Sequence, residues 1–223
     1  MSRALKLAAI AADTAARGVA PANGALTLQG DRELEWTFCQ ARLSDGPGTT
    51  LDFGADIGVL SLAAALRGHD VVALDRLDVP HPVVHERVTR EVADILDRPL
   101  EGRQFDQIIN CSSVEHVGLA GRYGSSDVPD GDLEAMAILA ERLRPGGRHI
   151  VTVPVGRDLI CAPQHRIYGE QRLPRLLAPF EVAEEQFWRK TVRGWERSDR
   201  AAALATEGSA SFYALGLFVL TRR

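Results

Sequence analysis

The chain alternates between short apolar runs, which are typical of buried strands, and longer stretches whose apolar positions recur at helical spacing. The short runs predict strands at residues 49–53, 71–74, 91–93, 105–111 and 149–153, and later at 182–191 and 212–221. The helical spacing predicts helices at residues 5–17, 33–43, 59–66, 82–90 and 132–143. Strands that alternate with helices pair in parallel through right-handed crossovers. The pattern therefore predicts an α/β fold.

Two late strands, with little apolar periodicity between them, modify this picture. They predict an antiparallel C-terminal edge strand on a mainly parallel, Rossmann-like sheet with helices on both faces. Clusters of glycine and proline at residues 44–48 (SDGPG) and 144–147 (RPGG) make the clearest breaks. The chain is predicted to have an N-terminal helical cap, residues 1–48, and one compact unit, residues 49–223.

Composition narrows the class of protein. The chain has 26 basic and 30 acidic residues, so its net charge of -4 gives no general attraction for nucleic acid. No apolar run approaches the ~20 residues that cross a bilayer, and the start lacks the long apolar core of a secretory signal. The three cysteines, Cys39, Cys111 and Cys161, form no CxxC pair and predict neither a zinc site nor a disulfide framework. We expect a cytoplasmic protein that binds neither nucleic acid nor membrane, and the sequence leaves a homodimer open.

The turn after the first strand of the unit carries the clearest chemistry. Residues 51–58 read LDFGADIG, and the next predicted strand ends in Asp75. A dinucleotide site needs the spacing GxGxxG, which fails here because Asp56 stands two residues after Gly54. An acid-rich turn suits S-adenosylmethionine, which carries a sulfonium and an ammonium but no phosphate, and Asp75 would accept its ribose hydroxyls. The alternative is that Gly54 and Gly58 only make a tight turn.

From about Glu33 to its C-terminus the chain resembles the class I S-adenosylmethionine-dependent methyltransferases. The motifs that carry this resemblance, in the family's order, are the glycine-rich first motif (51–58), the ribose-binding acid (VALD, 72–75), the acid bordering adenine (ADI, 93–95), the fourth-strand motif (FDQIIN, 105–110) and the turn before the fifth strand (LRPGG, 143–147). The resemblance implies a bound S-adenosylmethionine. The residues expected to hold it are Asp52, Gly54, Ala55, Asp56, Gly58, Asp75, Arg76, Asp94, Ile95, Cys111 and Ser112.

Asp56 departs from that family, which usually has a glycine at this point of the first motif. Aspartate tolerates left-handed backbone better than most residues, and its carboxylate is able to pair with the cofactor ammonium. The sequence leaves open whether this residue preserves or abolishes cofactor binding.

A narrower resemblance, over residues 112 to about 180, is to a little-characterised group of methyltransferase-like proteins. Some members of this group are known only as a domain of unknown function. The motifs are SSVEH (112–116), GRYG (121–124), GDLEAM (131–136), VPVG (153–156) and HRIYG (165–169). This resemblance supports the fold and the cofactor more than any substrate.

Methyl transfer from a sulfonium depends mainly on alignment and desolvation, and needs a base only where the acceptor has a proton to lose. His116 follows the fourth strand, and its imidazole suits a general base. Alternatively, Glu115 and His116 cap the next segment or hold the cofactor. His165 is the second candidate for a catalytic role. The loop residues expected to bind the acceptor are Arg122, Tyr123, Arg166 and Tyr168, although Arg166 could instead pair with an acid such as Glu170.

Three other clusters are weaker candidates. His81 and His85 have the spacing of two metal ligands on a helix but lack a third ligand nearby. The acids at 130–134 could hold magnesium, but capping and the helix dipole also explain them. The basic and aromatic stretch at 189–200 contains acids, which favours an exposed segment over a nucleic-acid face. We therefore expect no metal site.

The sequence as a whole predicts an enzyme that transfers a methyl group from S-adenosylmethionine to a small molecule. The expected acceptor is a hydroxyl oxygen of a sugar or secondary metabolite, and a nitrogen or carbon acceptor stays open. Two alternatives stay open: a catalytically inactive, cofactor-binding partner subunit of an enzyme complex, and an NAD-linked oxidoreductase.

Overall fold

The computed structural model describes residues 31–80, 84–121, 123–124 and 126–222. The helix predicted at 5–17, most of the N-terminal cap, His81 and Arg122 lie outside these residues. Within the described part, no helix combines the length and the apolar composition that crossing a membrane requires.

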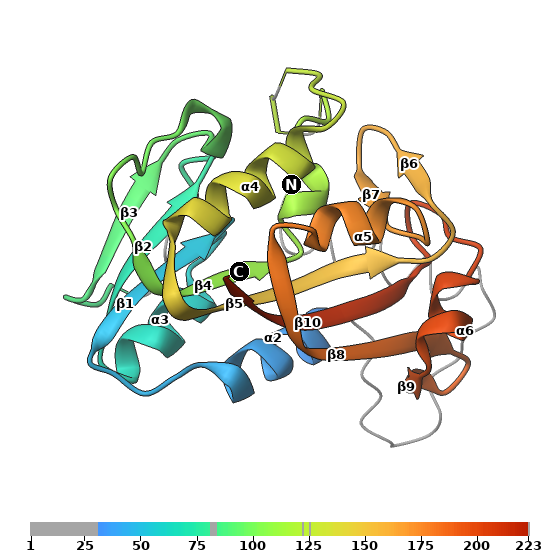
Figure 1. Cartoon of the computed structure of the whole chain (residues 1–223), viewed down its shortest axis with the longest axis horizontal. Coiled ribbons are helices and arrows are strands. Elements are labelled where there is room, and N and C mark those ends of the chain that lie inside the picture. Colours follow the sequence, from blue (N-terminus) through green and yellow to red (C-terminus); the bar gives the residue numbers. More distant parts are fainter. Residues whose placement is uncertain (1–30, 81–83, 122, 125, 223) are drawn as a thin grey trace.

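An eight-stranded sheet runs through the molecule (Figure 1), in the order β3-β2-β1-β4-β5-β10-β8-β9. Its strands are, in that order, β3 (Val88–Val92), β2 (His69–Asp75), β1 (Gly48–Phe53), β4 (Phe105–Cys111), β5 (Leu143–Val155), β10 (Ala214–Arg222), β8 (Phe180–Thr191) and β9 (Gly194–Ser198). The strands from β3 to β5 pair in parallel, whereas β10 and β9 pair antiparallel with their neighbours. The predicted, mainly parallel α/β fold is confirmed. The C-terminal strand β10 nevertheless lies inside the sheet, and β9 forms the antiparallel edge.

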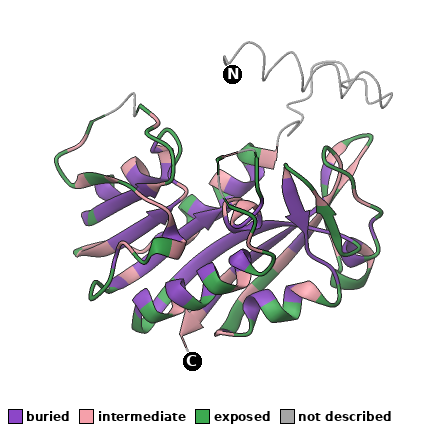
Figure 2. Cartoon of the chain, turned by 90° about the horizontal axis from the view of Figure 1, so that it is seen from above, coloured by how far each residue is buried: buried purple, intermediate pink, exposed green. Residues whose placement is uncertain are grey.

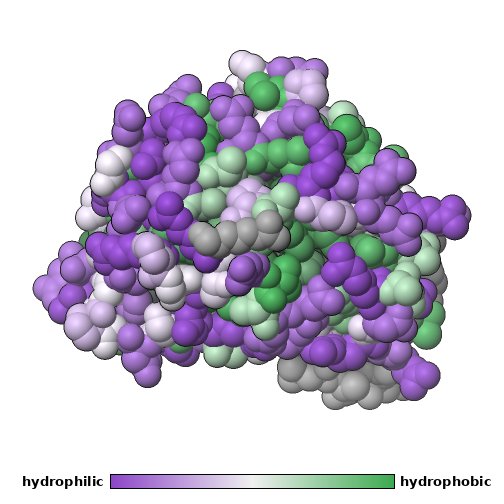
Figure 3. All heavy atoms as spheres, viewed as in Figure 1, coloured by the Kyte–Doolittle hydropathy of each residue, from purple (hydrophilic) through white to green (hydrophobic). Residues whose placement is uncertain are grey.

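Helices cover both faces of this sheet, as predicted. Alternate residues of a strand point to opposite faces, so Ile108 packs into one core and its neighbour Ile109 into the other. Figure 2 shows the central strands buried between the helices of the two faces. Figure 3 shows mainly hydrophilic side chains over the outer surface of the helices on the first face. The helices on the first face are α4 (Gly131–Arg142), α5 (Arg172–Leu177) and α6 (Arg200–Leu204), and those on the second are α2 (Asp31–Arg42) and α3 (Val59–Leu66).

Several short elements differ from the prediction. The described residues of the helix predicted at 82–90 form a loop and the beginning of β3, which starts earlier than the strand predicted at 91–93. Elements of three to six residues are too short to show periodicity, so the sequence pattern missed them. These elements are the hairpin β6 (Leu159–Cys161) and β7 (His165–Ile167), helices α5 and α6, strand β9, and the 3-10 turns η1 (Ile95–Asp97) and η2 (Val114–His116).

Two buried histidines in the sheet differ in their hydrogen bonding. His69 in β2 contacts Oγ1 of Thr50 at 2.9 Å and the carbonyl oxygen of Ser44 at 3.1 Å. His149 in β5 has no hydrogen-bond partner for either ring nitrogen among the described residues. Its ring packs edge-on against Phe180, with 5.0 Å between ring centroids. Burial lowers the pKa of His149 to about 3, so the folded chain keeps this ring neutral.

We expect His149→Phe to raise the free energy of unfolding by about 1–3 kcal/mol, the cost of a buried polar group without partners. Below a pH of about 6.5 the unfolded chain gains a proton at His149 that the folded chain does not take up. The native protein should therefore lose stability toward acid, and the variant should lose less. Urea unfolding at about pH 7.5 and about pH 5 measures both effects. His69→Phe, which removes the hydrogen bonds of His69 to Thr50 and Ser44, should destabilise the protein, and a destabilised His149→Phe would contradict this account.

Candidate functional site

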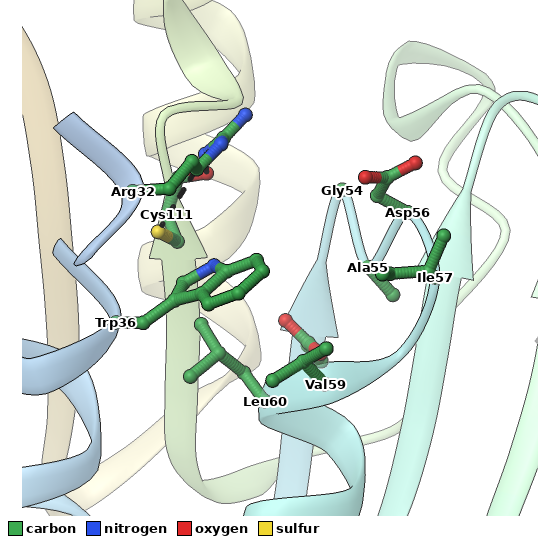
Figure 4. A pocket seen from close by; sticks show the side chains of 10 residues that line it. Arg32, Trp36, Gly54, Ala55, Asp56, Ile57, Val59, Leu60 and Cys111 are labelled. Atoms are coloured by element: carbon green, nitrogen blue, oxygen red, sulfur yellow. Dashed lines mark hydrogen bonds between the residues drawn. The ribbon is translucent and has the colours of Figure 1, made fainter. Parts of the chain in front are cut away.

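A hollow opens at the carboxyl ends of β1 and β4, where parallel sheets of this kind bind ligands. Its empty volume, open mouth included, is about 350 Å³. Figure 4 shows Arg32 and Trp36 of α2 on one side, the turn that follows β1 on the other, and the start of α3 below. The residues that line it are Arg32, Trp36, Asp52, Gly54, Ala55, Asp56, Ile57, Val59, Leu60 and Cys111.

The turn after β1 needs its glycines. Gly54 and Gly58 have φ of +73° and +77°, and a Cβ on Gly54 would lie 2.1 Å from Oγ of Ser113. Asp56 also adopts a left-handed conformation, with φ of 48°, which aspartate tolerates. Its backbone N–H donates to Oδ2 of Asp75 at 2.9 Å, so the acid at the end of β2 holds the turn in place.

Asp75 and the residues after it form the neighbouring part of the site. Oδ1 of Asp75 accepts from the N–H of Leu77 at 2.9 Å, which leaves each carboxylate oxygen able to accept a further hydrogen bond. Arg76 forms an ion pair with Asp94 and also donates to the carbonyl oxygens of Tyr123 at 3.0 Å and Gly124 at 2.8 Å. Arg76 thereby ties the end of β2 to Tyr123 and Gly124.

Asp52 and Ile95, which were expected to hold the cofactor, are each only 2% exposed. Asp52 lines the floor of the hollow and accepts a hydrogen bond from Oγ of Ser61 at 2.6 Å. Burial raises the pKa of Asp52 to about 6. Ile95 packs into the core on the α4 face of the sheet.

A group of buried acids lies beside the hollow, where α2 meets the end of β4. Glu35 of α2 accepts hydrogen bonds from the hydroxyl of Ser112 and from Oγ1 of Thr152, the latter at 2.7 Å. Its Oε2 lies 3.6 Å from Nη1 of Arg32, whose side chain is about half exposed. Glu115 of η2 is also buried, and burial raises its pKa to about 8, with the nearby Glu35 adding to the shift. The pKa of Glu35 is raised by burial as well, and Arg32 opposes that shift.

His116 is adjacent to this group and is held in one tautomer. Its Nδ1 lies 2.5 Å from the carbonyl oxygen of Gln164, which can only accept a hydrogen bond, so Nδ1 carries the proton. Its Nε2 lies 3.8 Å from Oε1 of Glu115 and is the nitrogen that can take up a further proton. The His116 ring lies within 6.2 Å of His165 and 5.1 Å of Tyr123, centroid to centroid. The structure thus brings both predicted catalytic histidines together.

Arg166 and Tyr168, which the sequence assigned to the acceptor, are fully buried and do not line the hollow. Arg166 donates to the carbonyl oxygen of Val117 at 2.6 Å and lies 3.6 Å from Asp132, not beside Glu170. The hydroxyl of Tyr168 donates to Asp132 at 3.1 Å. These side chains hold the segment that follows η2.

Sequence reasoning missed several residues that border the site. Glu35 and Trp36 come from the helix predicted at 33–43, which carried no motif, and Arg32 lies just before the predicted start of that helix, within the observed α2. The sequence did contain one signal for Glu35. This acid lies between Leu34 and Phe38 on the buried face of the helix, where an acid is unusual. The fourth missed residue is Tyr213, whose ring lies 5.1 Å from His165 and whose hydroxyl donates to Asp31 at 2.6 Å.

Comparison with known proteins identifies the fold. Residues 96–194 match a family described as "Caenorhabditis protein of unknown function, DUF268". No match was found among curated proteins. The chain is similar to the 1,6-didemethyltoxoflavin-N1-methyltransferase of Burkholderia thailandensis, with 21% identity, a TM-score of 0.61, and coverage of 100% of this chain and 92% of that one.

Two further solved structures are similar. The N-methyltransferase NodS of Bradyrhizobium japonicum is 16% identical, with a TM-score of 0.56 and coverage of 86% of this chain and 87% of that one. The [4+2]-cyclase SpnF is 17% identical, with a TM-score of 0.63 and coverage of 90% and 84%. The chain therefore has the fold of the class I S-adenosylmethionine-dependent methyltransferases, as its motifs predicted.

Proposed function

We propose that the protein binds S-adenosylmethionine and transfers its methyl group to a small-molecule acceptor. The observation that carries the proposal is the turn at 54–58 fastened to Asp75, which forms a glycine-lined cradle at the carboxyl ends of β1 and β2. The toxoflavin methyltransferase and NodS, which share this fold, were crystallised with S-adenosylhomocysteine. These neighbours favour neither the inactive subunit nor the NAD-linked oxidoreductase.

The residues of the hollow fit this cofactor. The oxygens of Asp75 keep the capacity to accept the ribose hydroxyls, and the half-exposed Arg32 offers a cation for the cofactor carboxylate. Asp52 and Asp56 give the cradle a negative character that suits a sulfonium and an ammonium. Trp36 closes the side of the hollow opposite the turn (Figure 4).

S-adenosylmethionine supplies a methyl group already activated by its sulfonium, so this chain must align the acceptor, exclude water and receive a proton. We assign proton uptake to Nε2 of His116, because Gln164 keeps the proton on Nδ1. Glu115, 3.8 Å from Nε2, would stabilise the imidazolium when its own carboxyl group is ionised. His165 and Tyr123 complete the wall near His116 and are proposed to contact the acceptor.

Calorimetric titration with S-adenosylmethionine, S-adenosylhomocysteine and NAD tests the proposal directly. We expect both sulfur compounds to bind and NAD not to bind. Transfer of a labelled methyl group from S-adenosylmethionine to an acceptor would establish turnover. Tight NAD binding, or no binding of either sulfur compound at millimolar concentration, would refute the proposed function.

Replacing Asp75 by Ala should weaken cofactor binding by about 10-fold or more, because charge-assisted hydrogen bonds contribute about 1.5–3 kcal/mol each. Asp75→Asn keeps one acceptor oxygen and should lose less. Asp78→Asn is the matched control, since this exposed acid of the same segment pairs with Arg90 and does not line the hollow. Unchanged affinity in Asp75→Ala would show that the ribose lies elsewhere.

A further inference from the structure

The buried acids beside the hollow have unused hydrogen-bonding capacity. Glu35 of α2 and Glu115 of η2 are 0% and 2% exposed, and their carboxyl groups interact electrostatically with each other. Among the residues that the structure describes, no donor hydrogen-bonds to Oε2 of Glu35 or to Oε2 of Glu115. A buried acceptor without a donor costs about 1–3 kcal/mol, and more when it is charged. Two such oxygens, on acids that interact with each other, indicate a ligand that supplies the missing donors.

The charges around these oxygens define the ligand further. Asp31, Glu35 and Glu115 interact electrostatically with the partly buried Tyr213, and Arg32 is a cation that interacts with all three acids. The distance of 3.6 Å from Arg32 to Oε2 of Glu35 is longer than a hydrogen bond, so Arg32 offsets charge without satisfying that oxygen. An anionic acceptor would be repelled, and a hydroxyl group supplies a single donor. An ammonium group supplies several donors and a positive charge.

We infer that Glu35 and Glu115 form the recognition site for a cationic amine, so that the acceptor of the proposed methyl transfer is an amine nitrogen. This inference rests on the proposed function and replaces the hydroxyl oxygen expected from the sequence. Glu35 and Glu115 each accept one N–H of the ammonium through Oε2. The rings of Tyr123, His165 and Tyr213, linked through edge contacts with His116 and His165, provide a surface for the apolar part of the amine.

The proton and electron balance of this reaction is complete. The bound ammonium gives one proton to Nε2 of His116 and becomes a neutral amine. The nitrogen lone pair then forms a bond to the methyl carbon while the carbon–sulfur bond breaks, and the electron pair of that bond stays on sulfur. The methylated nitrogen carries the positive charge, which the carboxylates continue to offset.

Binding of matched probes to the full chain, saturated with S-adenosylhomocysteine, tests the inference. Calorimetry should show 2-phenylethylamine binding at least about 10-fold more tightly than 2-phenylethanol, the expected effect of charge-assisted hydrogen bonds. Glu35→Gln and Glu115→Gln should each remove most of this preference and leave the weak binding of the alcohol unchanged. Glu33→Gln, at an exposed position of the same helix, is the control variant and should behave like the native protein.

A measurement on the native protein covers the case in which a Gln variant fails to fold. The affinity for the amine should rise as the pH increases from about 6.5 to about 8.5, as Glu115 ionises, whereas that for the alcohol should stay constant. Equal binding of amine and alcohol, an amine affinity independent of pH and of both Gln variants, or no binding of either probe would overturn the inference. If S-adenosylhomocysteine itself fails to bind, the proposed function falls, and this inference falls with it.

Discussion

Replacing His116 by Gln should lower the turnover of methyl transfer by about 100-fold or more, since a positioned general base contributes roughly 10²–10⁴-fold. Glutamine can still hydrogen-bond to the carbonyl oxygen of Gln164, so the variant keeps the packing of η2 and loses the proton acceptor at Nε2. Binding of S-adenosylhomocysteine should stay within about a factor of two, because His116 does not line the hollow that would hold it.

Single-turnover kinetics and calorimetry on the same preparation separate these effects. His85→Gln is the matched control, because His85 lies before the amino end of β3, whereas the site lies at the carboxyl ends of the parallel strands, and the change should have no effect. Unchanged turnover in His116→Gln would exclude this residue as the base. An equal loss of turnover and of cofactor affinity would instead assign it to cofactor binding, the alternative left open by the sequence.

Replacing Asp132 by Asn should lower the free energy of unfolding by about 3–5 kcal/mol, the range found when one partner of a buried ion pair is removed. Asp132 is fully buried and receives Arg172 at 2.5 Å and the hydroxyl of Tyr168 at 3.1 Å, with Arg166 at 3.6 Å. The remaining described contacts of the Arg166 guanidinium are backbone carbonyl oxygens, so its charge would stay buried beside a neutral amide.

Chemical denaturation measures this loss, and hydrogen exchange at residues 115–119 locates it. Asp130→Asn is the control, since this exposed acid pairs with Arg172 and Arg175 at the surface, and its unfolding free energy should stay close to that of the native protein. If Asp132→Asn were no less stable than Asp130→Asn, the buried network would not hold η2 in place.

Most of the central sheet could be predicted from the sequence because its strands have continuous apolar runs. The strand predicted at 105–111 and the helix predicted at 59–66 lie at their observed positions. The position of the C-terminal strand could not be predicted in the same way. Apolar residues on both faces of a strand show that it is buried, but they do not say which neighbours it pairs with.

The two parts of the site, the turn with Asp75 and the pair of buried acids, also differ in how far the sequence predicts them. The turn at 54–58 and Asp75 are encoded locally, since the glycine spacing and the acid at a strand end are visible without tertiary structure. The acids Glu35 and Glu115 are 80 positions apart in the sequence, and they become neighbours only when α2 packs against the end of β4. Arg166 is an opposite case. Its position in a loop predicted a contact with a ligand, but the fold buries this arginine beside Asp132.

The position of β10 has a consequence for the synthesis of the protein. This strand joins β5 to β8, yet it comes last of the sheet's strands in the sequence. A ribosome therefore releases β5 well before the strand that covers its free edge. During that interval β5 exposes unpaired backbone groups and apolar side chains, which are able to pair with another nascent chain. We expect the protein to need chaperone protection late in translation, until residues 214–222 have emerged.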